Sequence, residues 1–497
     1  MTQAQRAKAA PQTTRARLQS IIKESRNIMR KDAGLNGELD RLPQLAWLLF
    51  LRALDEVEQE REVVDPTYRP AILGKYRWSA WATVDTTGEP LMRFVNDELL
   101  PHLRGLRGSG RAGDPRDTLA SIFANVTNRM LSGYLLKDLV DQLGKVDFAN
   151  ADDLNTMALL YESMLKEMRD AAGDSGEFYT PRPLVRFITD MVDPQVGETV
   201  LDPAMGTGGF LVEAFEHMIE KAETAREREQ VKRSIRGIEK KSMPFLLAEM
   251  NFLLHGIDQA TAVQTNALAN SAAELRRDGV HVVLTNPPFG GEEERGVQDN
   301  FPAGMRTSET VWLFLQAVMA RLEKRKGRCW IVVPNSVLFD QGIGARIKAE
   351  LLARFNLHTV LRLPNGVFAP YTLIPSNVLF FEHGKQADHI WFYEHPAPQG
   401  RKNYTKTKPL LHEEFAECRD WWGGSDRAER VETSHAWKVT TADVVTEGYN
   451  LDRRNPHRAD DLTNRAPEEL VAELIDTERE FLDLLEELQR EIKDFSA

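Results

Sequence analysis

Six short apolar runs separated by helical segments are the feature that most restricts the fold of this chain. The runs are ETVLDP (198–203), RSIRGIE (233–239), HVVLTN (281–286), GRCWIVVP (327–334), HTVLRLP (358–364) and SNVLFFE (376–382). Each has the length of a strand, and the segments between them show helical periodicity. Strands that alternate with helices in this way predict a doubly wound α/β sheet.

The remainder of the 497-residue chain divides around this section. Helical runs such as RLQSIIKESRNIMR and LPQLAWLLFLRALDEV predict a helical N-terminal domain over residues 1–165. The Gly- and Asp-rich break DAAGDSGE then leads into a predicted catalytic domain over 166–395. An irregular extension over 396–460 gives no assignable signal, and residues 461–497 predict a single acidic amphipathic helix.

Composition limits the environment and the partners. No segment approaches the roughly 20 apolar residues of a membrane span, and the first residues lack the apolar stretch of a signal peptide, so we expect a cytoplasmic protein without membrane contact. The two cysteines, Cys329 and Cys418, have neither metal-ligand spacing nor a disulfide pattern, which fits a reducing compartment. A net charge of -12 is unfavourable for gripping nucleic acid alone. Either the ligand is not nucleic acid, or a partner contributes the basic surface.

A glycine-rich turn follows the first strand-like run. Asp202 ends the run, and Gly206, Thr207, Gly208 and Gly209 lead into an apolar helix. Glycines at such a turn allow a ligand to approach the backbone and leave helix N–H groups facing it, which favours a nucleotide-like ligand.

An acidic residue ends the second run. Glu239 lies where a carboxylate can accept hydrogen bonds from both hydroxyls of a ribose. A solvated acid at a helix start is the structural alternative.

The motif GEFYTPRP precedes the first run. Thr180 is a suitable N-cap, and Pro181 suits the first position of a helix with an apolar stripe of Leu184, Ile188 and Met191. A capped helix explains the motif, but a helix N-terminus beside a ligand pocket also favours a carboxylate.

The third run ends on Thr285-Asn286-Pro287-Pro288-Phe289, which no strand can continue. Two prolines fix the backbone while leaving its carbonyl groups free, so the stiffness indicates a site.

Two polar loops and the histidines have weaker signals. The basic loop RGLRGSGRAGDPRD (104–117) either touches phosphate or is a solvated surface loop, and the latter is favoured. The acidic loop GGEEERGVQDN (290–300) is either mobile until DNA arrives or simply exposed. His217, His255 and His281 have no metal-like spacing, and we predict no metal site.

In this order, GEFYTPRP, LDPAMGTGGF and TNPPF resemble the motifs of amino-group DNA methyltransferases, and the Asn-Pro-Pro-aromatic form is similar to the adenine-N6 enzymes. From about residue 150 to 385, including LPNGVFAPYTLIPSNVLFF, the chain resembles the methylation (M) subunit of Type I restriction-modification systems, and the helical N-terminal domain is similar too. The resemblance implies a Rossmann-like, S-adenosylmethionine-dependent methyltransferase domain. Its implied cofactor-binding residues are Glu177, Phe178, Tyr179, Thr180, Pro181, Arg182, Asp202, Gly206, Thr207, Gly208, Gly209, Glu239 and Asn266.

Two positions depart from the family pattern. Met205 replaces the Cys or Ala expected before Gly206, and Asn266 lies where an acidic residue often contacts the adenine of the cofactor. The second departure puts that contact in doubt.

The resemblance also implies the catalytic group and the partners. Asn286 and Pro287 would each accept one hydrogen of the target amino group, Pro288 would stiffen the turn, and Phe289 would stack on a flipped adenine, with Phe368 a weaker candidate for an opposite wall. The implied partners are a DNA specificity (S) subunit, a second copy of the M subunit, a restriction (R) subunit and double-stranded DNA. No cysteine is placed for a covalent cytosine mechanism.

Two other functions use the same motifs. Enzymes that methylate the side-chain amide of protein glutamine share the Asn-Pro-Pro-aromatic site, and a catalytically idle scaffold could keep the fold for assembly. The flanking helical regions weigh against the first, and the joint presence of Asp202, Glu239 and Asn286 weighs against the second.

The C-terminal segment predicts a helix with one apolar seam. Its positions are Val471, Leu474, Glu478, Phe481, Leu485, Leu488 and Ile492, with Glu478 the only interruption. The seam either packs on the helical N-terminal domain or docks onto helices of the specificity subunit, and the acidic net charge favours the second.

Overall fold

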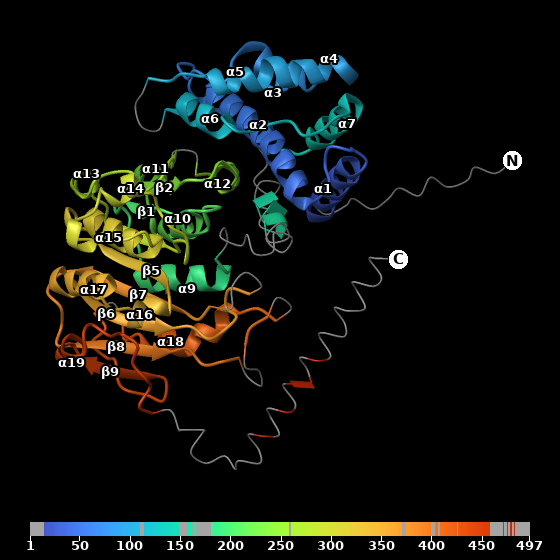
Figure 1. Ribbon diagram of the computed structural model, residues 1–497. Helices are drawn as coiled ribbons and strands as arrows, with labels where there is room; N and C mark the ends of the chain where they lie inside the picture. The colour runs from blue at the N-terminus through green and yellow to red at the C-terminus, as the bar shows by residue number, and fades with distance from the viewer. Residues whose placement is uncertain are drawn as a thin grey trace.

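The computed structural model of the chain describes residues 14–109, 114–148, 157–158, 160–161, 163–165, 180–257, 260–369, 374–398, 403–405, 408–424 and 426–457, and single residues at 471, 475, 478, 479 and 482. They form a helical region, at the top of Figure 1, and a sheet with helices on both faces below it. Among these residues, no helix is long and apolar enough to cross a membrane.

The helical region is built from short helices around a long one. They are α1 (Thr14–Arg30), α2 (Glu38–Val64), α3 (Trp78–Trp81), α4 (Gly88–Arg93), the π-helical η2 (Phe94–Leu99), α5 (Leu100–Gly105), α6 (Pro115–Phe123) and α7 (Gly133–Leu143), with a 3₁₀ turn η1 (Gly74–Tyr76). Two of these helices have side-chain N-caps. Asp114 accepts a hydrogen bond from a backbone N–H in the first turn of α6, and Ser132 does the same for α7. The prediction of a helical N-terminal region is confirmed.

One nine-stranded sheet organises the rest of the chain. The strands are β1 (Val200–Asp202), β2 (Ile235–Glu239), β3 (Thr261–Gln264), β4 (Val282–Thr285), β5 (Arg328–Pro334), β6 (Phe355–Arg362), β7 (Ser376–His383), β8 (His389–Glu394) and β9 (Ala436–Thr440). Their order is β3-β2-β1-β4-β5-β7-β6-β8-β9. The five neighbouring strands β3, β2, β1, β4 and β5 are parallel to one another. β7 runs antiparallel to both β5 and β6.

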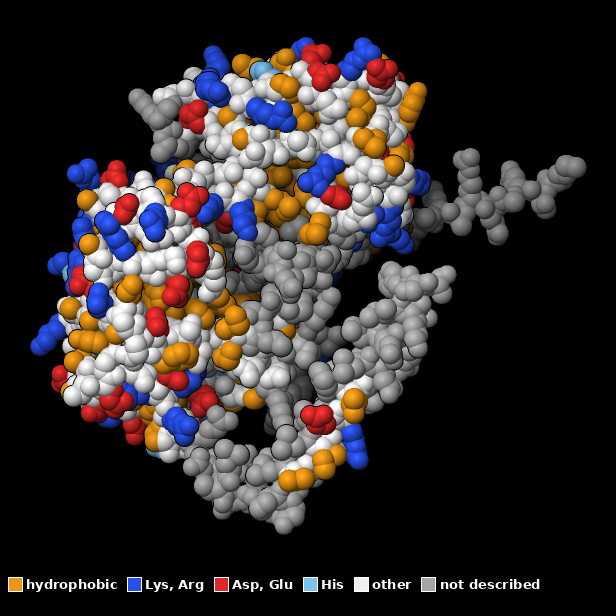
Figure 2. Space-filling view, viewed as in Figure 1, with side chains coloured by type: hydrophobic (Ala, Val, Ile, Leu, Met, Phe, Trp, Pro, Cys, Tyr) orange, Lys and Arg blue, Asp and Glu red, His pale blue; other side chains and the backbone are white. Residues whose placement is uncertain are grey.

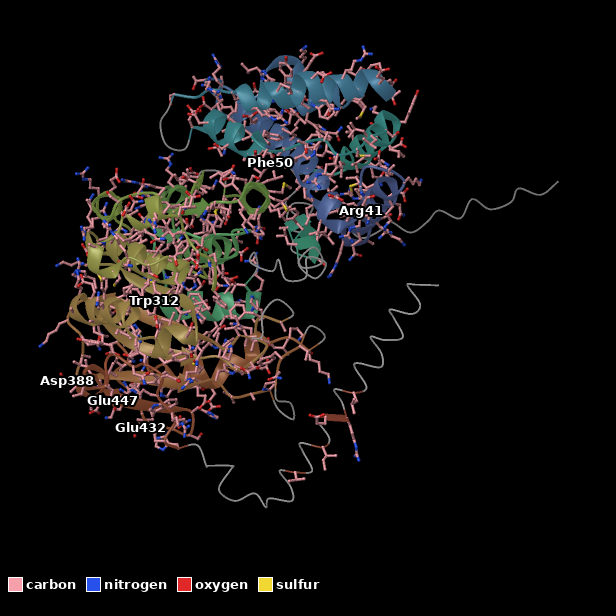
Figure 3. The ribbon with its side chains drawn as sticks, viewed as in Figure 1. Arg41, Phe50, Trp312, Asp388, Glu432 and Glu447 are labelled. Atoms are coloured by element: carbon pink, nitrogen blue, oxygen red, sulfur yellow. The ribbon has the colours of Figure 1, made fainter. Side chains whose placement is uncertain are left out.

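Helices cover both faces of the sheet. They are α9 (Arg182–Val192), α10 (Gly209–Lys221), α11 (Ala225–Ser234), α12 (Ser242–Leu254), α13 (Ala272–Arg277), α14 (Arg295–Gln298), α15 (Thr310–Glu323), α16 (Ser336–Phe339) and α17 (Ile343–Arg354), with a 3₁₀ turn η4 (Ala303–Met305). Alternate residues of one strand enter different cores: Val282 of β4 belongs to the buried cluster that includes residues of α9, α10 and α12, and Val283 belongs to the cluster that includes residues of α15 and α17. Trp312 of α15, labelled in Figure 3, is buried in the second core.

The six apolar runs are the strands β1, β2, β4, β5, β6 and β7, so the doubly wound α/β prediction is confirmed. β3, β8 and β9 were not predicted. The extension that gave no assignable signal contains η5 (His412–Phe415), α18 (Ala416–Trp421), β9 and α19 (Thr441–Thr446), and β9 pairs with β8 at one side of the sheet. Figure 3 shows the side chains of Asp388, Glu432 and Glu447 at this end of the molecule.

The helical region meets the sheet domain through α12. α2 packs against α12, and α6 contacts both α12 and β3. The other side of α12 carries Ala248 and Phe252, which lie against the glycine turn after β1. The division into domains at 165, 395 and 460 stays a prediction, as does the C-terminal helix, most of which lies outside the described residues.

Candidate active site

Three of the predicted site residues lie at one edge of the sheet. β1 lies between β2 and β4, and the three strands are parallel. Asp202 and Glu239 end β1 and β2, and Asn286 directly follows β4. In open α/β sheets, ligands bind outside the carboxyl ends of the strands where the strand order reverses, which here is between β1 and β4.

Residues of α12 pack against the glycine turn and form a hydrogen bond with it. Gly208 has a φ of 79°, and a Cβ atom on it would lie 2.6 Å from the ring of Phe252. Asn251 is fully buried and donates a hydrogen bond from Nδ2 to the carbonyl oxygen of Thr207 at 3.0 Å. Asn251 was not predicted as a site residue, although a lone Asn within the apolar run of α12 is a signal that sequence offers.

Glu239 is not the solvated acid of the structural alternative. Its side chain is buried and accepts hydrogen bonds from the backbone N–H of Gly206 at 3.0 Å and of Lys241 at 2.8 Å. Burial raises the pKa of Glu239, and the two backbone donors oppose that rise. An ionised carboxylate offers about four acceptor positions, so two are left for a ligand such as a ribose diol.

Asp202 connects the ends of β1 and β4. Its Oδ1 atom accepts a hydrogen bond from Oγ1 of Thr285 at 2.7 Å and from the backbone N–H of Ala204 at 3.0 Å. Burial raises the pKa of Asp202 to about 7, and the nearby Glu239 adds to that rise. The carboxyl group is therefore close to half protonated at neutral pH.

Asn286 is oriented by a residue from the motif before β1. Its Nδ2 atom donates a hydrogen bond to Oγ1 of Thr180 at 3.1 Å. Its Oδ1 atom is buried, and no group in the described part of the chain donates a hydrogen bond to it. An amide fixed on its donor side, with its acceptor unsatisfied, is ready to accept a hydrogen from a ligand.

The helix after GEFYTPRP begins later than the sequence suggested. α9 starts at Arg182 with Pro181 at the N-cap position, and its N-terminus has no side-chain cap. The prediction that Thr180 caps this helix is therefore wrong, because its hydroxyl accepts from Asn286 instead. Arg182 donates from Nη1 to the carbonyl oxygen of Gly209 at 2.7 Å, which ties this motif to the glycine turn. Residues 177–179 lie outside the described residues.

The prolines and aromatic residue after Asn286 are only partly exposed. Pro287 is buried, and Pro288 and Phe289 are half-buried. The ring of Phe289 meets that of Phe368 edge to face, with centroids 5.6 Å apart and planes at 85°. Because the rings are in contact and nearly perpendicular, they do not form two facing walls for a base in this structure.

Asn266 contacts the loop after Phe289. Its Nδ2 atom donates to Oε2 of Glu293 at 3.1 Å, and its Oδ1 atom accepts from the backbone N–H of Leu268 at 3.0 Å. Glu293 also accepts from Nζ of Lys240 at 2.9 Å. Burial of Glu293 was not predicted, since the loop was expected either to be exposed or to be mobile until DNA arrives.

A pocket brings most of these groups together. Its lining residues are Thr180, Arg182, Val185, Asp202, Ala204, Met205, Gly206, Thr207, Gly209, Phe210 and Asn286. Residues from the three motifs therefore share one pocket. Glu239 is not among the lining residues, but its carboxylate accepts a hydrogen bond from the backbone N–H of Gly206, which lines the pocket. Asn266 is not among them either and lies after the end of β3.

Two families match the chain in sequence. The family described as N-6 DNA Methylase matches residues 152–464, and the HsdM N-terminal domain matches residues 18–143. The chain is 41% identical over 477 residues to the Type I restriction enzyme EcoEI methylase subunit of Escherichia coli, covering 95% of this chain and 97% of the relative. It is 31% identical to the EcoKI methylase subunit of E. coli strain K12, covering 83% and 78%.

Solved structures are similar over nearly the whole chain. A modification subunit of a putative type I restriction enzyme from Vibrio vulnificus YJ016 is 48% identical, with a TM-score of 0.79, and the match covers 90% of this chain and 99% of that one. A chain from a structure concerned with complex assembly and conformational transition of the type I R-M system is 39% identical, with a TM-score of 0.82, covering 97% and 99%.

Proposed function

Since the chain belongs to the N-6 DNA methylases and, within them, to the methylase subunits of Type I restriction enzymes, which methylate the N6 amino group of adenine in DNA, we propose that the pocket at the ends of β1 and β4 binds S-adenosylmethionine and presents Asn286 to the target amino group. The observation that carries the assignment of Asn286 is its amide geometry. Nδ2 is held by Thr180, and Oδ1 is a buried acceptor without a donor in the described part of the chain.

The residues of the pocket fit this cofactor. Glu239 has two acceptor positions free for the ribose hydroxyls, and the positive φ of Gly206 and Gly208 keeps the turn open to close approach. Asp202 is the acid in the pocket that would face the ammonium group of the methionine moiety. Thr180 and Arg182 also line the pocket, and we propose that Glu177, Phe178, Tyr179 and Pro181 of the same motif contribute to cofactor binding.

The chemistry requires the amino group of adenine to be made nucleophilic. Its lone pair is delocalised into the ring, and S-adenosylmethionine supplies the electrophilic methyl group. Asn286 Oδ1 and the carbonyl oxygen of Pro287 each accept one amino hydrogen, which turns the lone pair toward the methyl group. They also stabilise the positive charge that develops on the nitrogen until it releases a proton. Pro287 and Pro288 keep the two acceptors in place because their φ angles are fixed.

The target adenine must leave the duplex to reach Asn286. A flipped base is commonly held by stacking on an aromatic ring, and Phe289 follows the acceptors directly. Phe368 contacts Phe289 by its edge, so we assign Phe368 to supporting that ring rather than to a second wall.

The partners follow from the family and from the charge. We propose that the chain works with a DNA specificity subunit, a second methylase subunit and a restriction subunit. The net charge is -12, and on the face shown in Figure 2 the described Lys and Arg side chains are interspersed with Asp and Glu. DNA binding depends on neutralising phosphates, so much of the basic surface is expected from a partner.

A methyl-transfer assay tests the proposal. The chain, assembled with its specificity subunit, is incubated with S-adenosylmethionine carrying a labelled methyl group, with DNA in one arm and with a Gln-containing protein substrate in another. We expect label in DNA, recovered as N6-methyladenine. Label in protein alone would identify a glutamine methyltransferase, and no label in either would identify an idle scaffold.

A further inference from the structure

The loop that follows Phe289 contains three consecutive glutamates with different environments. Glu292 and Glu294 are exposed, whereas Glu293 between them is only 9% exposed. The backbone of Glu293 is fixed as well: its N–H donates to the carbonyl oxygen of Ser308 at 2.8 Å, and its carbonyl accepts from Nε2 of Gln298 at 2.7 Å. The loop therefore buries the side chain of Glu293 and leaves those of Glu292 and Glu294 exposed.

Glu293 bridges the ends of two neighbouring strands. Oε1 accepts from Nζ of Lys240, which directly follows Glu239 at the end of β2, and Oε2 accepts from Nδ2 of Asn266, just beyond β3. β2 and β3 are paired in parallel, and the backbone N–H of Thr265 donates to the carbonyl oxygen of Glu239 at 2.9 Å. The carboxylate of Glu293 thus lies one residue away from the acid assigned to the ribose, on the side away from the pocket of Asn286.

We propose that the base of a nucleoside bound by Glu239 extends from the ribose toward this strand end. Glu293 then recognises that base by accepting a hydrogen bond from the 6-amino group of the cofactor's adenine, a role for which Asn266 alone is poorly arranged. The inference rests on the proposed binding of S-adenosylmethionine. It assigns a specificity-determining residue from a loop that is distant in sequence from the other cofactor contacts.

The hydrogen-bond arrangement explains why Glu293 rather than Asn266 takes this role. The Oδ1 atom of Asn266 already accepts from the backbone N–H of Leu268, and its Nδ2 atom is directed at Glu293. Glu293 accepts one side-chain hydrogen bond each from Lys240 and Asn266, and an ionised carboxylate has about four acceptor positions. A hydrogen bond to a charged acceptor is stronger than one to an amide.

The proposal makes a prediction about purine choice. A 6-amino group donates to a carboxylate, a 6-oxo group does not, and a purine with hydrogen at position 6 makes no hydrogen bond there. The cofactor site should therefore discriminate against nucleosides that lack the amino group. A glutamate that only holds the loop would influence all purines equally.

Calorimetry with two ligands separates these roles. The full-length chain is titrated with S-adenosylhomocysteine and with the same molecule carrying hydrogen in place of the 6-amino group. The wild type should prefer the amino compound by roughly ten- to a hundredfold. In Glu293→Ala most of this preference should disappear, because affinity for the amino compound falls while affinity for the other changes less than about threefold.

Two further variants complete the test. Glu293→Gln keeps the size and one acceptor oxygen but loses the charge, so its preference should be intermediate, and Glu294→Ala, at an exposed neighbouring glutamate, should behave as the wild type. An equal loss of affinity for both ligands in the Glu293 variants, or an unchanged preference, would overturn the proposal. A wild type that binds neither ligand would instead remove the cofactor assignment on which the proposal rests.

Discussion

The amide of Asn286 and the hydroxyl of Thr180 are joined by a hydrogen bond of 3.1 Å across 106 positions of sequence. In this arrangement Thr180 accepts from Nδ2, which leaves Oδ1 as the amide atom that faces the pocket. Thr180 therefore holds the side chain of Asn286 in the position in which its acceptor is open to a ligand.

Replacing Thr180 tests this relationship. Thr180→Val removes the acceptor while keeping the shape, and we expect the rate of methyl transfer at saturating cofactor and DNA to fall roughly three- to tenfold, the value of one hydrogen bond. Thr180→Ser keeps the hydroxyl and should recover most of the rate. Single-turnover kinetics of the assembled complex measure both, and equal rates for Thr180→Val and the wild type would contradict the orienting role.

Replacing Asn286 should separate catalysis from binding. Asn286→Ala removes an acceptor that acts mainly in the transition state, so we expect methyl transfer to fall by about 10²- to 10³-fold or more, with cofactor affinity nearly unchanged. Phe289→Ala should have a smaller effect on the rate. If Asn286→Ala lost cofactor binding together with activity, the residue would be maintaining the fold instead.

Removing the carboxylate of Glu239 should weaken the cofactor. Glu239→Ala deletes two acceptor positions for the ribose hydroxyls, and we expect a loss of about 1.5–3 kcal/mol, or roughly ten- to a hundredfold in affinity for S-adenosylmethionine. Calorimetry measures the affinity. Glu220→Ala, at an exposed glutamate of α10, is the matched control. Unchanged affinity in Glu239→Ala would exclude Glu239 from the site.

The raised pKa of Asp202 predicts a pH-dependent stability. In the folded chain the pKa of Asp202 is about 7, above its ordinary value near 4, so the unfolded chain releases this proton first as the pH rises. Ionisation therefore costs the folded state stability progressively between about pH 4 and pH 7. The cost has an upper bound of roughly 4 kcal/mol.

Asp202→Asn should remove that cost. Without the cofactor, the variant should be close to the wild type in unfolding free energy near pH 4 and more stable at pH 8, where the wild-type carboxyl is ionised. Denaturant titrations at the two pH values measure the difference. A stability difference that does not change with pH would show that Asp202 titrates normally.

Truncation after residue 465 tests the role of the C-terminal segment. We expect a folded chain that still binds S-adenosylmethionine but no longer assembles with the specificity subunit and methylates no DNA. Val471, one of the described seam positions, is 53% exposed, which leaves it available for a partner. A truncated chain that co-purifies with the specificity subunit would contradict this role, and one that binds no cofactor and has lost stability would support packing on the helical region.

The strands that sequence predicted are those with continuous apolar character. β1, β2 and β4 to β7 lie within the sheet and are largely buried, and most of them contain a short continuous apolar stretch, such as VVL in β4, WIVV in β5 and VLFF in β7. β3, with the sequence TAVQ, and β9, with AWKVT, are the two edge strands and are partly exposed, so polar residues interrupt their pattern. Because the exposed positions of an edge strand carry polar residues, the continuous apolar run from which a strand was predicted is interrupted there.

The grouping of three candidate site residues at one edge of the sheet was predictable from sequence. Asp202, Glu239 and Asn286 each come at the end of an apolar run, and parallel strands bring such ends together. Glu293 and Asn251 were missed for a different reason. Their roles depend on partners 27 and 44 positions away, and nothing in the local pattern distinguishes Glu293 from the glutamates on either side of it.

One thirteen-residue helix, α12, contacts α2 on one side and the glycine turn on the other. The contact with the turn is tight, because Phe252 occupies the space where Gly208 would carry a side chain, and Asn251 grips Thr207. Since the packing on both sides is tight, a displacement of the helical region that moved α12 would also move the turn. Assembly and cofactor binding would then be coupled through α12, and by reciprocity the cofactor would change the assembly equilibrium.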